Sequence, residues 1–252
     1  MASSPPSFPA KFNDPIYCEL EHACLDEKPA YTALSYVWGD PKVTKPIKLR
    51  YYSRSQPPRE KHVINATSNA HLVPQVPLEI PKTQENSFEQ FQVTTNLAEA
   101  LRYLRDEVES LTFWIDAVCI NQGGLRERSA QVQVMGSFYS LASEVRIWLG
   151  PAHRSSPEKS NVTSVEEQVK AADRFLSRAQ TTSKELGCPI ISIHDNDRSF
   201  KIEETEIQGL DFISSRKWWS RIWVLQEAHH GASPRILQCG STKMAFGPCT
   251  NV

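Results

Sequence analysis

One short segment holds the residues best suited to chemistry. It reads Trp218-Trp219-Ser220-Arg221-Ile222-Trp223-Val224-Leu225-Gln226-Glu227, with three tryptophans and one carboxylate. If the segment is helical, Trp223 and Glu227 lie four residues apart and share one face of the helix. An indole can exclude water from a neighbouring carboxyl group and offer a stacking surface to a flat ligand. The alternative is that Glu227 is a solvated residue of a surface helix, which is the commoner situation for a glutamate.

Three further groups of candidate residues come at the ends of predicted strands. They are Trp38-Gly39-Asp40, Asp116 with Asn121 and Gln122, and Gly150. The runs 31–38, 112–120 and 145–149 that contain or precede them are rich in apolar, aromatic and β-branched residues, as strands are. Ligands bind beyond the carboxyl ends of the strands in open parallel sheets, so these residues are candidates for a binding site. Turn formation by the glycines and helix capping by Asp116 are the alternative uses.

A helix is predicted from about Leu125 to Ser143, and it begins at the same edge of the sheet. Its N-terminus would favour a phosphate, because unpaired backbone N–H groups and the helix dipole point there. Arg126 and Arg128 could add charge to such a contact, and solvation or pairing with an acid such as Glu127 is the alternative.

Composition excludes several classes of function. The 252 residues carry a formal net charge of −1, which gives no electrostatic footprint for nucleic acid. No apolar run approaches the roughly 18 residues that a membrane-spanning helix needs, and the N-terminus lacks the features of a secretory signal. The six cysteines are scattered without a CxxC pair, so free thiols in a reducing compartment, the cytoplasm, are expected.

Missing motifs narrow the field further. The chain contains no GxGxxG, GxxxxGK[ST], GxSxG or HExxH, which removes the usual dinucleotide, P-loop, hydrolase and zincin signatures. Cys18, His22 and Cys24 form the one local cluster of ligand-type side chains, but their spacing does not suit zinc, and no metal is expected. Cys119 is interpreted as a core residue of its apolar run rather than a nucleophile.

The order of predicted elements indicates one α/β domain over residues 1–252. Residues 1–16 read as a loose leader, and the proline-rich residues 53–92 as an insertion or mobile loop. Between and after them, predicted strands alternate with amphipathic helices over 97–111, 125–143, 165–179 and 207–213, and the first of these helices has Asn96 and Glu99 as its capping pair. A last strand is predicted at 235–239 and a weak one at 189–193. Alternation of this kind predicts a mostly parallel open sheet flanked by helices.

Three blocks of sequence resemble a known family. The first is residues 31–39; the second runs from Phe113 to Gln122 and on through Glu127-Arg128-Ser129 to Trp148-Leu149-Gly150; the third is residues 219–227. In this order they are similar to the HET (heterokaryon incompatibility) domain of filamentous fungi, over about residues 17–240. The resemblance implies a role in fungal non-self recognition with cell death as the output. It also implies a distant relation to TIR domains, and so a TIR-like or flavodoxin-like fold.

The TIR relation implies a role for each candidate residue. The glutamate that follows a tryptophan by four positions is central to NAD cleavage in TIR enzymes, which makes Glu227 the candidate catalytic acid and NAD the candidate substrate, with no cofactor required. The candidate substrate-binding residues are Trp38, Gly39, Asp40, Asp116, Asn121, Gln122, Arg128, Arg221 and Trp223.

Within that reading, each residue type has a task. Trp38 and Trp223 could stack on nicotinamide or adenine, Arg128 and residues 121–124 could bind the diphosphate, and Glu227 could stabilise a cationic transition state at the ribose. The rival reading is a non-enzymatic death adaptor that signals by homotypic assembly, because aromatic residues are also enriched at protein interfaces. A nucleotide-binding module without turnover is a third reading. Self-association is expected in the first two.

Overall fold

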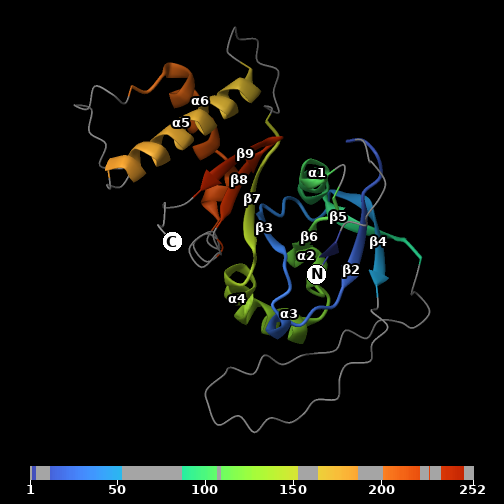
Figure 1. The fold of residues 1–252 in the computed structure, drawn as a ribbon. Helices are drawn as coiled ribbons and strands as arrows, with labels where there is room; N and C mark the ends of the chain where they lie inside the picture. Colours follow the sequence, from blue (N-terminus) through green and yellow to red (C-terminus); the bar gives the residue numbers. More distant parts are fainter. Residues whose placement is uncertain are drawn as a thin grey trace, which may run out of the picture.

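The computed structural model describes residues 2–3, 12–52, 87–106, 109–152, 164–186, 201–221, 227 and 234–246. Within them, one mixed sheet has the strand order β5-β4-β2-β1-β6-β3-β7-β8-β9 (Figure 1). The strands are β1 (Ala2–Ser3), β2 (Tyr17–Glu21), β3 (Thr32–Tyr36), β4 (Thr44–Tyr52), β5 (Glu89–Thr94), β6 (Thr112–Trp114), β7 (Glu144–Gly150), β8 (Arg235–Cys239) and β9 (Thr242–Phe246).

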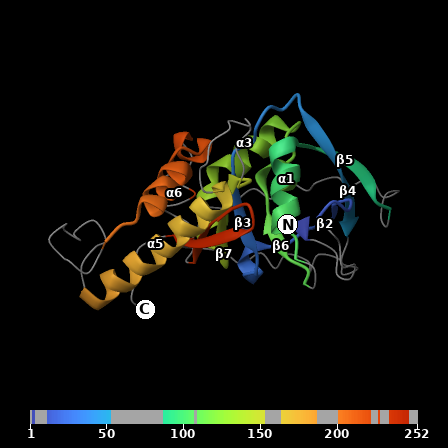
Figure 2. The ribbon, with the colours of Figure 1, turned by 90° about the horizontal axis from the view of Figure 1, so that it is seen from above.

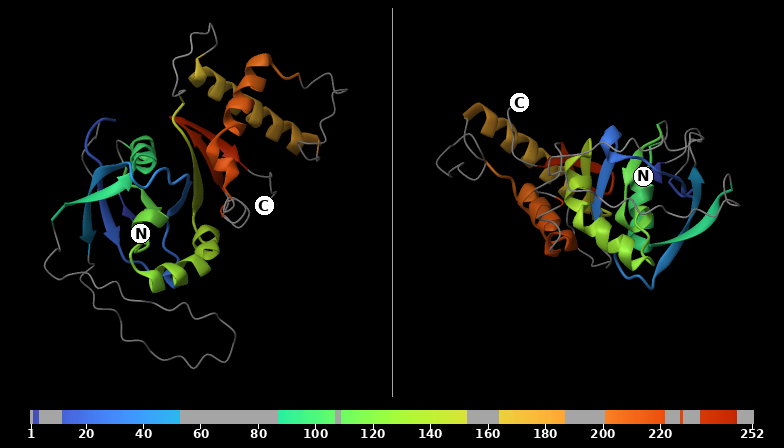
Figure 3. Two further views of the ribbon diagram at one scale, coloured as in Figure 1. Left: turned by 180° about the vertical axis from the view of Figure 1, so that it is seen from behind. Right: turned by 90° about the horizontal axis from the view of Figure 1, so that it is seen from below.

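Helices flank this sheet. They are α1 (Thr95–Leu104), α2 (Asp116–Cys119), α3 (Leu125–Gln133), α4 (Met135–Ser140), α5 (Val165–Leu186) and α6 (Glu204–Ser214), with 3-10 turns η1 (Leu25–Glu27) and η3 (Lys217–Ser220). Figures 1 and 2 show α5 and α6 together beside β7–β9, and α1 over the part of the sheet that contains β4–β6. In the left view of Figure 3, α3 and α4 (yellow-green) lie below α5 and α6 (yellow-orange and orange).

The α/β class and the flanking helices are confirmed, and the sheet is less parallel than predicted. β6, β3, β7 and β8 run parallel in one group, and β2 and β4 in another. β1 lies antiparallel between the two groups, and the outer strands β5 and β9 are antiparallel to their neighbours. The sheet is therefore mixed. The prediction missed this because the antiparallel edge strands and the short strand β1 leave no clear pattern in the sequence.

Two predicted boundaries are corrected. The stretch 1–16 is not wholly a loose leader, since Ala2–Ser3 forms β1 and Ile16 is buried. The predicted insertion 53–92 ends earlier than expected, because β5 begins at Glu89 and pairs with β4. Residues 53–86, and the weak strand predicted at 189–193, lie outside the described residues.

Several predicted elements differ in extent. The apolar run 112–120 forms strand only to Trp114 and then the short helix α2, so Asp116 begins a helix instead of lying late in a strand. The helix predicted over 125–143 is broken at Val134 into α3 and α4. The helix predicted over 97–111 ends at Leu104, and Thr94 is its cap where Asn96 was expected: the Thr94 hydroxyl accepts from the N–H of Leu97.

The buried side chains form two clusters on opposite faces of β3. Leu34 and Tyr36 belong to the cluster that packs against α1, and Tyr31 and Ala33 belong to the cluster that packs against α4, α6 and η3. This alternation follows from the two-residue period of a strand. The carboxyl end of β3 thus has a buried layer on each side. Among the described residues, no helix combines the length and the hydropathy needed to cross a membrane.

Candidate functional site

Ionisable side chains meet at the carboxyl ends of β3 and β6. We call Ser35, Tyr36, Asp116, Arg221 and Glu227 the charged centre. Strand β3 supplies Ser35 and Tyr36 on its two faces, and the turn after β6 supplies Asp116 as the first residue of α2. Arg221 follows η3 in extended conformation, with φ −84 and ψ 136. The extended Arg221 shows that the segment 218–227 is not one continuous helix, contrary to the prediction.

Glu227 is fully engaged within the charged centre. Its side chain is buried, with 2% relative exposure. Arg221 donates from Nη1 to Oε2 at 2.9 Å and from Nη2 to Oε1 at 2.9 Å, and Ser35 Oγ donates to Oε2. Paired charge-assisted bonds of this kind are what make a buried carboxylate tolerable. Trp218 Nε1 in turn donates to Ser35 Oγ at 2.7 Å, so the hydroxyl is held from both sides.

Asp116 is the second carboxyl group of the charged centre. Its Oδ2 accepts from Trp38 Nε1 at 2.7 Å, and its Oδ1 accepts from the N–H of Ala117 at 2.7 Å. Burial raises the pKa of Asp116 above its ordinary value of 3.8, the two hydrogen bonds oppose that rise, and the negative charge of Glu227 adds to it. Because Trp38 is 38% exposed, the Asp116 side of the centre lies nearer to solvent than Glu227 does.

Two tyrosines complete the buried surroundings. The hydroxyl of Tyr36 is buried and has no hydrogen-bond partner of normal geometry among the described residues. Burial, and then the charge of Asp116, raise the pKa of Tyr36 well above 10. Tyr139 of α4 donates to the carbonyl of Leu34 at 3.2 Å, and its pKa is raised by burial and by Glu227 and Asp116. Both phenols are therefore neutral at physiological pH.

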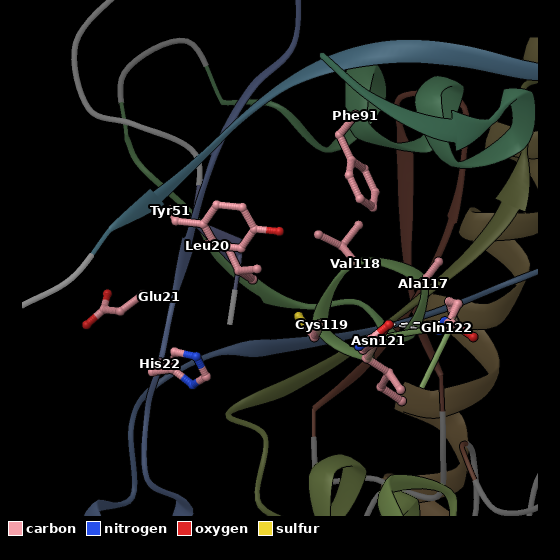
Figure 4. A pocket seen from close by; sticks show the side chains of 12 residues that line it. Leu20, Glu21, His22, Tyr51, Phe91, Ala117, Val118, Cys119, Asn121 and Gln122 are labelled. Atoms are coloured by element: carbon pink, nitrogen blue, oxygen red, sulfur yellow. Dashed lines mark hydrogen bonds between the residues drawn. The ribbon is translucent and has the colours of Figure 1, made fainter. Parts of the chain in front are cut away.

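A cavity of about 420 Å³ lies on the other side of α2 (Figure 4). It is lined by Leu20, Glu21, His22, Tyr51, Phe91, Ala117, Val118, Cys119, Ile120, Asn121, Gln122 and Gly123. Three cavity-lining residues bond directly to Asp116. The N–H of Ala117 donates to its Oδ1 at 2.7 Å, and the N–H of Ile120 and Nε2 of Gln122 donate to its backbone carbonyl at 3.1 and 3.0 Å. The cavity and the charged centre thus share helix α2 but no side chain.

The predicted site residues fall into separate places. Trp38, Asp116, Arg221 and Glu227 come together, whereas Asn121 and Gln122 line the cavity. Cys119 is half-buried, packs against both buried clusters, as its interpretation as a core residue requires, and also lines the cavity.

Three of the other predicted residues, Gly39, Asp40 and Arg128, are described and neither belong to the charged centre nor line the cavity. Arg128 is exposed on α3. Asp40 is exposed and accepts from the N–H of Lys42 at 2.9 Å, and Gly39 has a φ of 82°, which suits the turn that was the alternative for it. Trp223 lies outside the described residues.

Sequence reasoning missed Ser35 and Tyr36 as parts of the charged centre, and Trp218 and Tyr139 as residues that contact its strand β3. Ser35 could have been recognised from the sequence, because it is the one small polar residue in the otherwise apolar and aromatic run Ala33-Leu34-Ser35-Tyr36-Val37. A small polar residue in a strand buried on both faces needs a partner. The identity of these partners, Trp218 and Glu227, could not be predicted, because both are far from Ser35 along the chain.

The sequence comparisons agree with each other. Residues 31–227 match the family model described as "Heterokaryon incompatibility protein (HET)". The chain is 28% identical over 242 residues to "Heterokaryon incompatibility protein 6, OR allele" of Neurospora crassa, covering 86% of this chain and 30% of that protein. It therefore spans less than a third of the relative's length. No solved structure matches the chain.

Proposed function

Because the chain belongs to the heterokaryon incompatibility (HET) family, we propose that it acts in fungal non-self recognition as the part of the response that causes cell death. The name of the Neurospora crassa relative supports this role. We further propose that the biochemical step is cleavage of NAD to nicotinamide and ADP-ribose at the charged centre, as a distant relation to TIR domains would imply.

The observation that carries the enzymatic part is the burial of two carboxyl groups beside one arginine. Asp116 and Glu227 interact electrostatically with each other and with Arg221, and all three are largely buried. Removing a charged group from water costs on the order of several kcal/mol in real proteins, and hydrophobic residues could fill the same space at lower cost. Clusters of buried titratable groups at the carboxyl edge of a sheet are found where they serve catalysis or binding.

The reaction matches the chemistry of these groups. Water replaces nicotinamide at the anomeric carbon of the ribose: the bond to the pyridinium nitrogen breaks, its electron pair leaves with neutral nicotinamide, and the water loses one proton. The transition state carries positive charge on the ribose, which a nearby carboxylate stabilises. Glu227 is the carboxylate for this task, and the diphosphate of NAD offers Arg221 an alternative anion that would release Glu227 from its ion pair.

One observation favours a second function. Both oxygens of Glu227 are occupied by Arg221 and Ser35, and Glu227 does not line the cavity. A carboxylate held in this way also suits a purely structural role. The second candidate is therefore a death adaptor without catalysis, which signals by assembly of several copies.

The experiment that separates the two is an assay of nicotinamide release by the purified chain at high protein concentration. Wild-type protein is expected to consume NAD, and Glu227→Gln to lose about 10²–10³-fold in rate, because it removes the charge that stabilises the transition state. Glu206→Gln is the matched control. Glu206 is also buried and also accepts two bonds from an arginine, Arg178, but it belongs to α6 and not to the charged centre.

Thermal unfolding of both variants completes the design. Both lose the ion pair of a buried carboxylate, so both are expected to unfold at lower temperature than the wild type. Only Glu227→Gln should lose turnover. An active Glu227→Gln protein would contradict the assigned role, and a wild-type protein without turnover, in an assay where it self-associates, would support the adaptor.

A further inference from the structure

The open sheet ends in two edge strands, β5 and β9, which differ in how they are protected. A free edge strand presents unpaired N–H and C=O groups, and proteins usually shield it with lysine, proline, a bulge or a covering element. At β9, Lys243 is exposed, α5 packs against the strand, and Nε2 of Gln180 donates to the carbonyl of Ala245 at 3.1 Å. β9 therefore has both a charged side chain and a covering helix.

β5 lacks these devices. Its sequence is Glu89-Gln90-Phe91-Gln92-Val93-Thr94, without lysine, arginine, proline or glycine, and its pairing with β4 contains no bulge. Figure 2 shows β5 at the right-hand border of the ribbon, on the side away from α5 and α6. In the part of the chain that the structure describes, β4 is the one strand that pairs with β5, and no other segment bonds to the backbone of Gln90 or Gln92. β5 is therefore an edge to which another strand could add.

Two residues of β5 turn their backbone groups to this edge. Lys48 of β4 donates its N–H to the carbonyl of Ile16 at 2.8 Å, on the side away from β5. Gln90 lies opposite Lys48, so this is a non-hydrogen-bonded pair of the antiparallel ladder. Gln92 lies opposite Pro46, which has no N–H to donate, and this pair is of the same kind. The N–H and C=O groups of Gln90 and Gln92 therefore point away from β4.

A second copy of β5 fits this edge in an antiparallel register centred on Phe91. Gln90 then lies opposite Gln92 of the second copy, so that their outward N–H and C=O groups meet as a hydrogen-bonded pair. Phe91 is half-buried, and in this register it meets Phe91 of the second copy. Aromatic pairs across neighbouring strands stabilise a sheet, and neutral glutamines facing each other bring no like charges together.

The charges at the two ends of this register are complementary. Glu89 would lie opposite Val93 of the second copy, and within each chain Val93 lies opposite Lys45. Glu89 of one copy therefore stands two strands from Lys45 of the other, with about 9.5 Å between their Cα atoms. Both side chains are exposed and long, so they can approach each other over Val93. Two-fold symmetry gives this attraction twice.

We propose that β5 is an interface between two copies of this chain, which pair antiparallel about Phe91 and join their sheets into one. The proposal rests on the self-association that both proposed functions involve, and it does not require NAD cleavage. The charged centre has no residue on β4 or β5, so pairing and turnover can be changed separately.

Single cysteine variants of the purified full chain test the register. Opposite residues of a hydrogen-bonded pair have Cα atoms about 5.5 Å apart, a distance that a disulfide can bridge. A mixture of Gln90→Cys and Gln92→Cys is therefore expected to form a covalent dimer under mild oxidation, with the bond between the two new cysteines identified by mass spectrometry. In either variant alone the new cysteines lie on a diagonal, about 7–8 Å apart, and should cross-link far less. The wild type gives the background from its own six cysteines.

A second measurement needs no cross-link. The double variant Gln90→Lys/Gln92→Lys would place lysine opposite lysine twice, so its dimer dissociation constant, measured by analytical ultracentrifugation, should be several-fold higher than that of the wild type. Ala245→Lys is the control, because it sets a second exposed lysine beside Lys243 on the other edge strand. It should associate like the wild type.

Three results would overturn the proposal. They are no covalent dimer in the mixture, as much covalent dimer in either variant alone as in the mixture, and unchanged association of a folded Gln90→Lys/Gln92→Lys protein. Each is distinct from failure of the proposed activity, which is read from NAD turnover in the wild type and Glu227→Gln. A chain that cross-links as expected but leaves NAD intact would keep this interface and lose only the enzymatic role.

Discussion

At the scale of single residues, Ser35 links an indole to a carboxylate. Its hydroxyl accepts from Trp218 and donates to Glu227, and a hydroxyl can do both at once. Arg221 supplies the charge that Glu227 needs in a buried place. Glu227 is therefore held by three hydrogen bonds from two residues before any ligand arrives, whereas Asp116, beside the exposed Trp38, accepts from two donors.

Asp116 gives a prediction on pH. Because burial raises its pKa above 3.8, the folded state holds the proton of Asp116 more tightly than the unfolded state. The stabilisation from this proton is complete below pH 3.8 and is lost as the pH rises through the folded-state pKa. Asp116→Asn removes the titration. The free energy of unfolding of the wild type, relative to Asp116→Asn, should therefore fall as the pH rises above about 4, as measured by urea denaturation.

The exposed Asp40 supplies the control variant Asp40→Asn. A wild type that gains stability relative to Asp116→Asn over the same range would contradict the prediction, since that sign requires a lowered pKa.

The candidate residues at this scale were partly predictable from the sequence. Trp38, Asp116, Arg221 and Glu227 stand out by type and by their position after apolar runs, and the structure brings them together. Tyr36 and Tyr139 read as ordinary aromatic core residues, and their burial agrees with that reading. Their place beside two carboxyl groups depends on how β3, α2 and α4 pack, which one sequence does not reveal.

At the scale of elements, α5 and α6 cross at close distance. The crossing is at Gly209, where a Cβ atom would lie 2.0 Å from the carbonyl oxygen of Gln168 in α5. Backbone atoms cannot move aside as a flexible side chain can, so the two helices would have to separate. Glycine at this position therefore fixes how deeply α6 packs on α5.

Gly209→Ala is expected to lower the free energy of unfolding by about 1–3 kcal/mol or more, because it overpacks a helix contact. Gly136→Ala in α4 is the matched variant with the opposite sign: a Cβ there meets nothing within 4 Å, and alanine in a helix is favoured over glycine by roughly 0.5–1 kcal/mol. Denaturant midpoints of both variants check the pair. A Gly209→Ala protein as stable as the wild type would mean that the helices do not cross as described.

Elements with a clean period were predictable, and elements that tertiary packing decides were not. The apolar stripe from Val165 to Ala179 correctly predicted α5, and the apolar run 145–149 correctly predicted β7. The run 112–120 has the composition of a buried strand, yet α2 begins inside it, with Asp116 accepting from the N–H of Ala117. An apolar run buried on all sides suits either element, so its period cannot choose between them.

At the scale of the whole molecule, charge is almost balanced. A formal net charge of −1 gives little electrostatic repulsion between copies of the chain. Near-neutral proteins associate more readily than highly charged ones. This property suits both proposed functions, since each involves assembly.

We predict that NAD turnover per mole of protein rises with protein concentration, because the proposed activity depends on self-association. Rate assays over a dilution series, with light scattering on the same samples, would check this. A constant specific activity across the range where the scattering shows association would separate catalysis from assembly.

The two-residue strand β1 has a consequence for motion. Ala2 and Ser3 form the seam between two groups of strands, with Leu20 and Glu19 on one side and Phe113 and Thr112 on the other. The β2–β4 ladder on one side is longer, whereas the β3–β6 ladder on the other side is as short as those of β1, and short pairings open at lower free energy than long ones. Parting of the two groups along this seam would keep their own ladders, and its cost would be the separation of Ile47 and Leu49 from Leu34 in the buried cluster that packs against α1. Such an opening would move Tyr51 of β4 away from Val118 of α2 and would leave the contacts of Glu227 intact.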